Sequence, residues 1–266
     1  MTDMTQTDSG VAAIEMIDVQ LRHPEIVSPW RVNGVNWRVE AEDFWAVGGL
    51  HWSGKSNLLT TAAASHSRIR GSLRLFGRDI ADLSAEQTLE SRLRIGLVFE
   101  GDGRMFPNLT VAENIALPLR YRRENEDADV WNRLAEALES LDLAAAADAL
   151  PGEIDFGLKR RAALARAAIM QPDVLLLDQP LVGLDPRQRA WWVDLIEHIH
   201  EGHPLFGGRP TATVVATEDL RPWLDRANQF AVIGNSRFEA VGDKHELLES
   251  GNPLIEELIG VNMERN

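Results

Sequence analysis

Gly49-Leu-His-Trp-Ser-Gly-Lys-Ser56 is the stretch that decides the fold, because it fits the pattern G-x-x-x-x-G-K-[ST]. Before it, Val35–Val47 alternates apolar and polar residues as strands do, and after it Ser56–Ala64 has the composition of a helix. A glycine-containing loop between a strand and a helix points backbone N–H groups at the helix N-terminus, where the helix dipole favours phosphate. The stretch therefore predicts a phosphate-binding loop that opens an α/β fold.

Each part of the loop has a predicted role. Lys55 is expected to reach the β and γ phosphates of a nucleotide, and the Ser56 hydroxyl is expected to ligate Mg²⁺. The predicted nucleotide-binding residues of this stretch are Gly49, Leu50, His51, Trp52, Ser53, Gly54, Lys55, Ser56 and Asn57.

A second segment supports the same chemistry. Val174-Leu-Leu-Leu-Asp178 is a short apolar run that ends in an acid, which is typical of a buried parallel strand. Open α/β sheets bind ligands at the carboxyl ends of their strands. We therefore expect Asp178 to hold Mg²⁺ through water, and the alternative is that it caps the following turn.

Composition limits the classes of function. The chain has 266 residues and a formal charge of −14, which argues against nucleic acid as a partner because phosphate neutralisation needs a basic surface. No cysteine is present, so disulfides, thiolate–zinc sites and thiol nucleophiles are excluded. No apolar run approaches the roughly 20 residues of a membrane span, and the polar start lacks the pattern of an export signal. We expect a soluble, cytoplasmic protein.

The remaining pattern alternates strands and helices. An Ala- and Leu-rich apolar stripe over Val130–Ala147 predicts a helix that ends at Pro151-Gly152. Gly234-Asn235 is expected at the turn of a hairpin over Phe230–Val241. Further strands are predicted at Gly71–Phe76, Arg94–Phe99 and Ala212–Thr217, and further helices at Leu158–Met170, Pro186–Ile199 and the C-terminal end. The pattern predicts a doubly wound α/β core with a helical insert near 105–165.

The order of motifs resembles the nucleotide-binding subunits of ATP-binding cassette (ABC) transporters over nearly the whole chain. Asn252–Gly260 resembles, more narrowly, the ATPase subunits of Mce/Mla-type lipid transporters, as do the Lys-Arg-Arg-Ala-Ala-Leu-Ala-Arg-Ala and Val-Gly-Leu-Asp-Pro runs. The segments that carry the wider resemblance are Leu97–Glu100 with Met105–Leu119 (Q-loop region), Lys159–Ala167 (the helix after the signature motif), Leu177–Pro180 (Walker B end), Val182–Asp185 (D-loop, with Asp185) and Thr213–Asp219 (switch strand).

The resemblance implies a P-loop NTPase (RecA-like) α/β core, an ABC-type helical subdomain at about 105–165 and an N-terminal antiparallel β region. It implies one domain over 13–260, a flexible lead over 1–12 and a tail over 261–266. It also implies Mg-ATP or ADP as ligand and a second subunit placed head to tail, with each ATP between one chain's phosphate loop and the other chain's signature. The partner would be an integral-membrane permease, which would hold the chain at the inner face of the cell membrane.

Several catalytic positions depart from that family. Gln179 stands where a Glu activates the attacking water, and an amide cannot accept a proton near neutral pH. Glu218 replaces the switch His, and Glu100 replaces the Q-loop Gln, although a carboxylate can also bind Mg²⁺. The signature reads Ile154–Leu158, with Asp155, Phe156 and Gly157 at its centre.

The charged replacements bear on nucleotide binding. A carboxylate about 4 Å from a γ-phosphate would oppose it by about 4 kcal/mol at an effective dielectric near 20. This concerns Glu218 and Asp155; alternatively, Asp155 caps the following helix, and Glu218-Asp219 is a solvated loop pair. Trp52 is expected to crowd the phosphate loop, where the family has Gly.

Two lesser signals concern aromatic and histidine side chains. Trp30 is the nearest aromatic to stack on the nucleotide base, although the family's spacing falls closer to Ile26. The histidines His198, His200 and His203 invite a metal site, but their spacing on a helix does not bring them together.

Three functions follow as hypotheses. The first is a transporter subunit that binds Mg-nucleotide and hydrolyses it weakly or not at all. The second is a non-catalytic pseudo-ATPase that scaffolds or regulates a permease complex. The third is an active ATPase in which Glu100 or Glu218 is a displaced base. A homodimer is favoured over a heterodimer, because this chain would impair both composite sites of a mixed pair.

Overall fold

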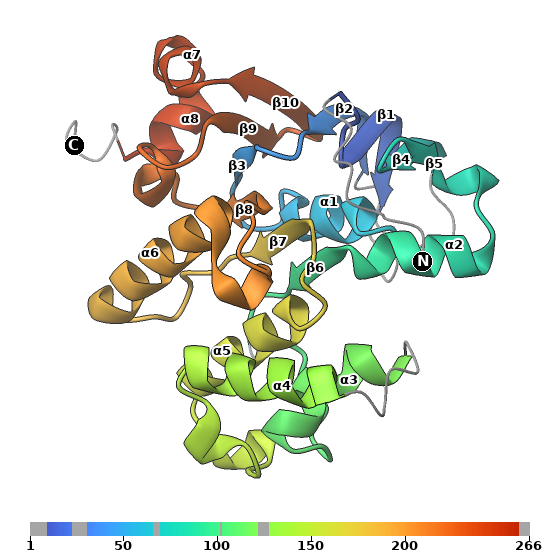
Figure 1. The fold of residues 1–266 in the computed structure, drawn as a ribbon. Coiled ribbons are helices and arrows are strands. Elements are labelled where there is room, and N and C mark those ends of the chain that lie inside the picture. Colours follow the sequence, from blue (N-terminus) through green and yellow to red (C-terminus); the bar gives the residue numbers. More distant parts are fainter. Residues whose placement is uncertain (1–9, 23–30, 66–69, 102, 122–127, 261–266) are drawn as a thin grey trace.

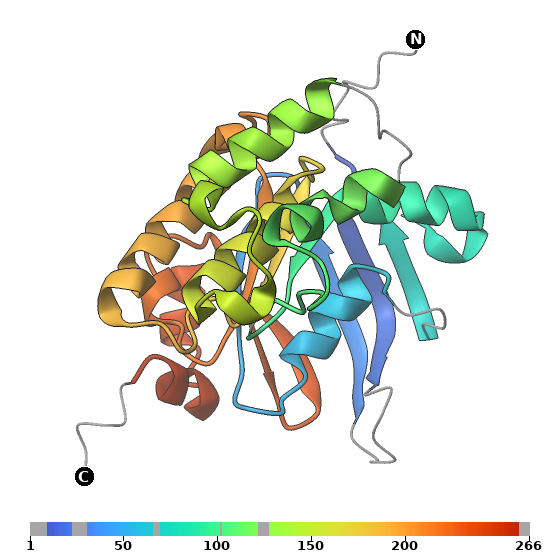
Figure 2. The ribbon, with the colours of Figure 1, turned by 90° about the horizontal axis from the view of Figure 1, so that it is seen from below.

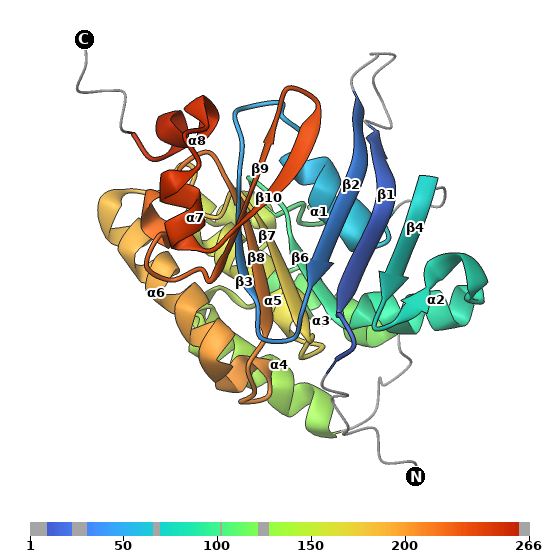
Figure 3. The same ribbon diagram turned by 90° about the horizontal axis from the view of Figure 1, so that it is seen from above.

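The computed structural model describes residues 10–22, 31–65, 70–101, 103–121 and 128–260. Two β-sheets and the helices around them build the fold (Figure 1). The first sheet is antiparallel in the order β2-β1-β4-β5, formed by β1 (Ile14–Arg22), β2 (Arg31–Val39), β4 (Arg70–Leu75) and β5 (Arg78–Asp79). β2, β1 and β4 stand side by side in Figure 3.

The second sheet is mainly parallel and follows the order β10-β9-β3-β8-β7-β6. Only its edge strand β10 runs antiparallel, to β9. The strands are β3 (Phe44–Gly48), β6 (Ile95–Val98), β7 (Val174–Asp178), β8 (Ala212–Thr217), β9 (Gln229–Gly234) and β10 (Arg237–Gly242). β10 packs beside β2 of the first sheet, where the Trp37 and Phe238 ring centroids lie 5.8 Å apart.

The alternation of apolar side chains explains the layers. Successive residues of β7 point to opposite faces of the sheet: Leu175 and Leu177 belong to one apolar core, and Val174 and Leu176 to the other. The second core lies between the two sheets and includes Leu58 and Leu59 of α1 (Lys55–Ala62). Because both faces of β3 and β7 are buried, these two strands are nearly continuous apolar runs, and Asp178 at the end of β7 is the exception.

The other core packs against helices. Helices α3, α4 and α5 group together on one side of the second sheet, toward the viewer in Figure 2. The remaining helices are α2 before β6, α6 after β7, and α7 and α8 at the C-terminal end. Their bounds are α2 Ala85–Leu93, α3 Val111–Tyr121, α4 Ala128–Ser140, α5 Phe156–Ala168, α6 Pro186–Gly202, α7 Lys244–Glu249 and α8 Pro253–Leu258, with short 3₁₀ turns at Ile80–Asp82, Ala144–Ala146, Pro151–Glu153, Pro204–Phe206 and Arg221–Trp223.

The predicted α/β fold class with an N-terminal antiparallel β region is confirmed, and several predicted boundaries are wrong. The strand pattern over 35–47 divides at a turn, and its halves join different sheets. The predicted helix over 130–147 ends at Ser140, because Asp142 has a φ of 53° and breaks the helical path. The hairpin turns at Asn235 and Ser236, both with positive φ, rather than at Gly234-Asn235. The final helix is two short helices.

The domain prediction stays a prediction. Helices α3 to α5 fall across its 105–165 span, the lead 1–12 is described only from residue 10, and the tail 261–266 lies outside the described residues. No helix among the described residues is both long and apolar enough to cross a membrane.

Parallel pairing brings four chain segments to one edge. Gly48 at the end of β3 pairs with Thr217 at the end of β8, and Asp178 at the end of β7 pairs with Ala216. Val98 of β6 pairs with Leu177. The loop after β3 and the residues that follow β6, β7 and β8 therefore meet at the carboxyl edge of the sheet, as expected for a ligand site.

Candidate functional site

The loop between β3 and α1 is built to leave backbone N–H groups open. Gly54 is the N-cap of α1 with a φ of 109°, and no side chain caps the first turn of that helix. The Gly49 N–H is instead paired with the Thr217 carbonyl at 3.1 Å, so Gly49 anchors the loop to β8. A Cβ on Gly49 would lie 2.7 Å from the Ile233 carbonyl oxygen, so only glycine fits there. An uncapped helix start behind a tight loop fits a phosphate.

Lys55 is the first residue of α1 and reaches back to this loop. It is 5% exposed, and its Nζ donates to the carbonyl oxygens of Gly49 at 2.5 Å and Leu50 at 2.8 Å. Burial lowers the pKa of the ammonium, while the nearby carboxylates of Glu218, Asp178 and Glu100 act in the opposite direction. Lys55 is thus the cation around which the acidic side chains of the site gather.

Glu218 lies directly on the loop. Its Oε1 is 3.5 Å from Lys55 Nζ and 3.4 Å from His51 Nδ1, and it accepts a hydrogen bond of 2.9 Å from Gln179 Nε2. Glu218 is exposed to solvent, as the alternative of a solvated loop pair expects, and it also contacts the loop. Glu218 faces the loop, whereas Asp219 accepts from Arg221 at 2.7 Å.

Asp178 and Ser56 are in contact, as a shared Mg²⁺ site would require. The Ser56 hydroxyl hydrogen-bonds to the Asp178 carboxylate, and Asp178 Oδ1 is buried with no hydrogen-bond partner in the described part of the chain. Burial raises the pKa of Asp178, the Ser56 hydrogen bond opposes that rise and the charge of Glu100 adds to it. An orphaned carboxylate oxygen beside a hydroxyl fits Mg²⁺, which prefers oxygen ligands and keeps waters and phosphate oxygens as the others.

Glu100 is exposed beyond the end of β6, near enough to influence Asp178, Lys55 and Arg160 electrostatically. Its role as a ligand of Mg²⁺ stays a prediction. The described residues contain no group of three or more His, Asp or Glu side chains that would hold a metal without phosphate.

Gln179 is buried at the turn after β7 and has a φ of 50°. Its backbone is held by Arg160 of α5, a residue that sequence reasoning missed. The Arg160 guanidinium donates to the carbonyl oxygens of Gln179 at 2.6 Å, Pro180 at 2.8 Å and Val182 at 2.7 Å. Burial lowers the pKa of this arginine. One signal could have found it: Arg160 falls on the same helical face as the buried Ala163 and Leu164.

Asp155 caps α5, which confirms the capping alternative. Its Oδ1 accepts from the Leu158 backbone N–H at 2.8 Å, and α5 begins at Phe156. Phe156 is 39% exposed, with its ring against Gly183, whose φ is 76°. Asp185 of the predicted D-loop caps α6 in the same way, through the Gln188 N–H at 2.8 Å.

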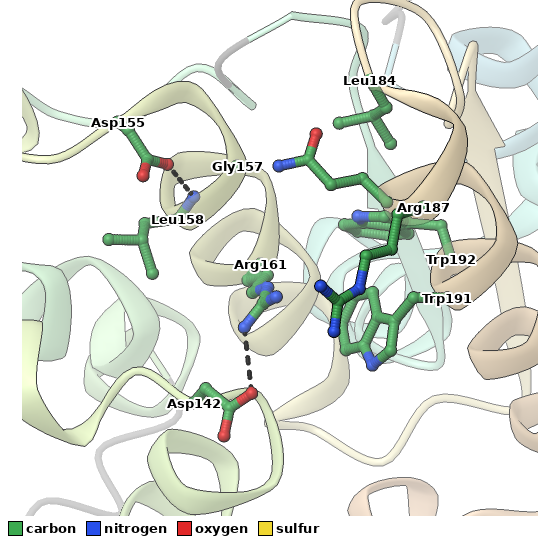
Figure 4. Close-up of a pocket in the computed structure, with 10 residues that line it drawn as sticks. Asp142, Asp155, Gly157, Leu158, Arg161, Leu184, Arg187, Trp191 and Trp192 are labelled. Carbon is green, nitrogen blue, oxygen red and sulfur yellow. Dashed lines mark hydrogen bonds and ion pairs between the residues drawn. The ribbon is translucent and has the colours of Figure 1, made fainter.

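A pocket of about 410 Å³ lies beside this signature segment (Figure 4). Arg161 on its wall pairs with Asp142 at 3.1 Å and lies over the Trp191 ring at 4.4 Å. The pocket is lined by Asp142, Asp155, Gly157, Leu158, Arg161, Leu184, Arg187, Gln188, Trp191 and Trp192. No residue of the phosphate loop lines it, so the pocket is separate from the carboxyl edge of the sheet.

The other predicted loop residues differ in how far they are exposed. The expectation that Trp52 crowds the phosphate loop is wrong: its side chain is 71% exposed and meets His51 edge-on at 5.2 Å. Its φ of 62° is the left-handed conformation in which glycine would be unstrained. Ser53 Oγ is buried without a partner among the described residues, and Asn57 lies in the first turn of α1.

Trp30 and Ile26, considered for base stacking, lie outside the described residues. Each of the three histidines has a ring nitrogen in contact with the backbone. His198 Nδ1 lies 2.7 Å from the Asp194 carbonyl oxygen, and His200 Nδ1 lies 3.2 Å from the Thr211 carbonyl oxygen. His203 Nδ1 accepts from the Leu205 N–H at 3.1 Å.

Comparison with known proteins agrees with this geometry. The profile of the ABC transporter family matches residues 32–182. The chain is 28% identical over 218 residues to the intermembrane phospholipid transport system ATP-binding protein MlaF of Haemophilus influenzae, covering 82% of this chain and 80% of that protein. It is 31% identical over 248 residues to the sulfate/thiosulfate import ATP-binding protein CysA of Mycolicibacterium paratuberculosis, covering 92% of this chain and 63% of that protein.

Solved structures share the fold. The ATP-binding cassette MJ0796, in a dimeric post-hydrolysis state bound to ADP and Pi, superimposes with a TM-score of 0.72 at 22% identity, covering 85% of this chain and 98% of that one. The cbiO1 protein from Clostridium perfringens, part of the ABC transporter complex cbiONQ, gives a TM-score of 0.71 at 20% identity over 96% and 97% of the two chains. From its family profile, its fold and its phosphate loop, the chain belongs to the ABC transporter family as a nucleotide-binding subunit.

Proposed function

We propose that this chain binds Mg-ATP or Mg-ADP at the loop Gly49–Asn57 and hydrolyses ATP weakly or not at all. The observation that carries the proposal is the buried Gln179 amide, which donates to Glu218 at 2.9 Å. An amide accepts no proton, and loss of a general base typically lowers a rate by about 10²–10⁴. Bound Mg²⁺ would neutralise phosphate charge, with Ser56, Asp178 and Glu100 as its protein ligands.

The chain's own residues have separate roles in this proposal. The open N–H groups at the start of α1 bind phosphate oxygens, and Lys55 supplies the positive charge. Gln179 and Glu218 hold each other in place and leave no switch histidine at the site.

The cargo and partners are also proposals. The similarity to MlaF, a phospholipid transport protein by name, and the Asn252–Gly260 segment support a lipid or related substrate. An integral-membrane permease would hold the chain at the inner face of the membrane. A homodimer is favoured, because Asp155 and Phe156 would impair a partner's site while Gln179 impairs this chain's own.

The test is a titration of the purified chain with Mg-ATP, followed by tryptophan fluorescence and by phosphate release. Exposed Trp52 should respond to ligand in its own loop, so Trp52→Phe should lose the signal, and Lys55→Ala should lose binding itself. We expect saturable binding and turnover far below about 1 per second, near the low end of ordinary enzymes. Turnover at or above that rate would contradict weak hydrolysis and favour Glu100 or Glu218 as base. Absence of binding by calorimetry would favour the pseudo-ATPase.

A gain-of-function pair makes the test sharper. Gln179→Glu combined with Glu218→His puts a base and a histidine back at the two positions. We expect phosphate release to rise at least tenfold over the wild-type chain. Gln179→Glu alone should gain less, because it places a second carboxylate against Glu218.

A further inference from the structure

The third contact of the Lys55 ammonium bears on which nucleotide the site prefers. An ammonium has three donors. Two are directed at loop carbonyls, those of Gly49 and Leu50, and the nearest anion to the third is Glu218 Oε1 at 3.5 Å. Lys55 is 5% exposed, so little solvent competes for that third direction.

In a phosphate loop the backbone N–H groups hold the α and β phosphates, and the lysine reaches the β and γ phosphates. An anion on the ammonium of Lys55 therefore lies where the last phosphate of a triphosphate would bind. The carboxylate of Glu218 is such an anion. Gln179 fixes it at 2.9 Å, and His51 lies 3.4 Å from the same oxygen.

The charges around Lys55 favour the same conclusion. Three carboxylates, those of Glu218, Asp178 and Glu100, act on this one ammonium. Bound Mg²⁺ would neutralise charge near Asp178 and Glu100. Glu218 has different neighbours, which are Gln179 and His51. A third phosphate would have to displace Glu218 from Lys55, whereas the β phosphate of a diphosphate is also held by the backbone N–H groups of the loop.

We propose that Glu218 is a specificity-determining residue that occupies the place of the terminal phosphate, so that the site takes a nucleoside diphosphate in preference to a triphosphate. The inference rests on the proposed nucleotide site. Full charges at the Lys55–Glu218 separation would allow the affinity for a diphosphate to exceed that for a triphosphate by a factor of about a thousand at an effective dielectric near 20. Partial exposure of Glu218 and screening by salt reduce the expected preference to about tenfold.

The test uses calorimetry of the full chain with Mg-ADP and with a Mg-bound, non-hydrolysable ATP analogue. Wild type should bind ADP at least about tenfold more tightly than the triphosphate. Glu218→Gln keeps the size and the acceptor for Gln179 but removes the charge, so triphosphate affinity should rise about tenfold while ADP affinity changes less than about threefold. Glu218→Ala should shift the ratio in the same direction.

Asp219→Asn is the matched control. It removes the same charge one residue away, from a carboxylate held by Arg221 rather than by the loop. It should leave the ratio of the two affinities unchanged. A similar shift in Asp219→Asn would overturn the proposal, because the effect would then come from net charge and not from the Lys55 contact.

The remaining outcomes separate the two proposals. Equal affinities for both nucleotides in wild type, unchanged in both Glu218 variants, would overturn this inference and leave the nucleotide site standing. No binding of either nucleotide to wild type or to either Glu218 variant would overturn the proposed function and this inference with it. Triphosphate binding gained only in the Glu218 variants would support the inference.

Discussion

Replacing Arg160 with Met should destabilise the turn between β7 and α6 more than the same replacement of the neighbouring Arg161. Arg160 is 3% exposed and donates to three carbonyls of that turn at 2.6–2.8 Å, those of Gln179, Pro180 and Val182. A fourth contact, to the Gly101 carbonyl at 3.3 Å, ties the turn to the segment after β6. Methionine keeps much of the apolar stem and removes every donor.

The magnitude follows from those contacts. Hydrogen bonds to a charged group contribute about 1.5–3 kcal/mol each, and they do not add fully when they share one group. Burial of the guanidinium, which lowers its pKa, carries a desolvation penalty that methionine relieves. The net loss in the free energy of unfolding should be about 3 kcal/mol. For a chain of this size that lowers the melting temperature by about 6–12 °C.

The assay is thermal and urea unfolding, with Arg161→Met as matched control. Arg161 is the next residue of α5, but it is more exposed. It pairs with Asp142 at the surface, donates to the Leu141 carbonyl oxygen at 3.4 Å and lies over the Trp191 ring. Its loss should lower the free energy of unfolding by about 1 kcal/mol or less. Hydrogen exchange at the turn should quicken only in Arg160→Met. Equal melting temperatures for the two variants would refute the assignment of Arg160 as the residue that holds the turn.

Two further predictions concern the loop and a titrating cap. Gly49→Ala places a Cβ 2.7 Å from the Ile233 carbonyl oxygen, so the loop must shift. Nucleotide binding measured by calorimetry should weaken at least tenfold, while the circular dichroism spectrum stays that of the wild type. Unchanged affinity would contradict the tight fit. His203 has its pKa lowered from 6.5 by burial and by His198, so the unfolded state binds its proton more tightly. The contribution of His203 to stability is therefore complete above about pH 6.5 and is lost as pH falls below it, when protonation removes the acceptor for the Leu205 N–H. Urea unfolding at pH 7.5 and 5.5 should show a larger loss for wild type than for His203→Asn, which keeps an acceptor that does not titrate; equal losses would rule out His203 as the cause.

The loop and the sheet strands were predictable because their signals are local. Consecutive residues specify the local structure of two segments, Gly49–Ser56 and Val174–Asp178. The first has glycine where the backbone needs it, and the second is an apolar run where both faces of a strand are buried. Boundaries were less predictable. The end of α4 depends on Asp142 with its positive φ, and an apolar pattern that continues past it gives no sign of the break.

Sequence alone determined the α/β fold, the phosphate loop, the acid at the end of β7, and the positions of Gln179 after that acid and of Glu218 after the strand Ala212–Thr217. Tertiary structure decided what these two side chains touch. That Glu218 lies on Lys55 follows from β8 lying beside β3 in parallel register, and that Arg160 holds the Gln179 turn follows from how α5 packs against the sheet. Such contacts depend on which strands become neighbours and on where a side chain ends in three dimensions. A pattern along the chain records neither, because it reflects only the burial and conformation of each residue in its own segment.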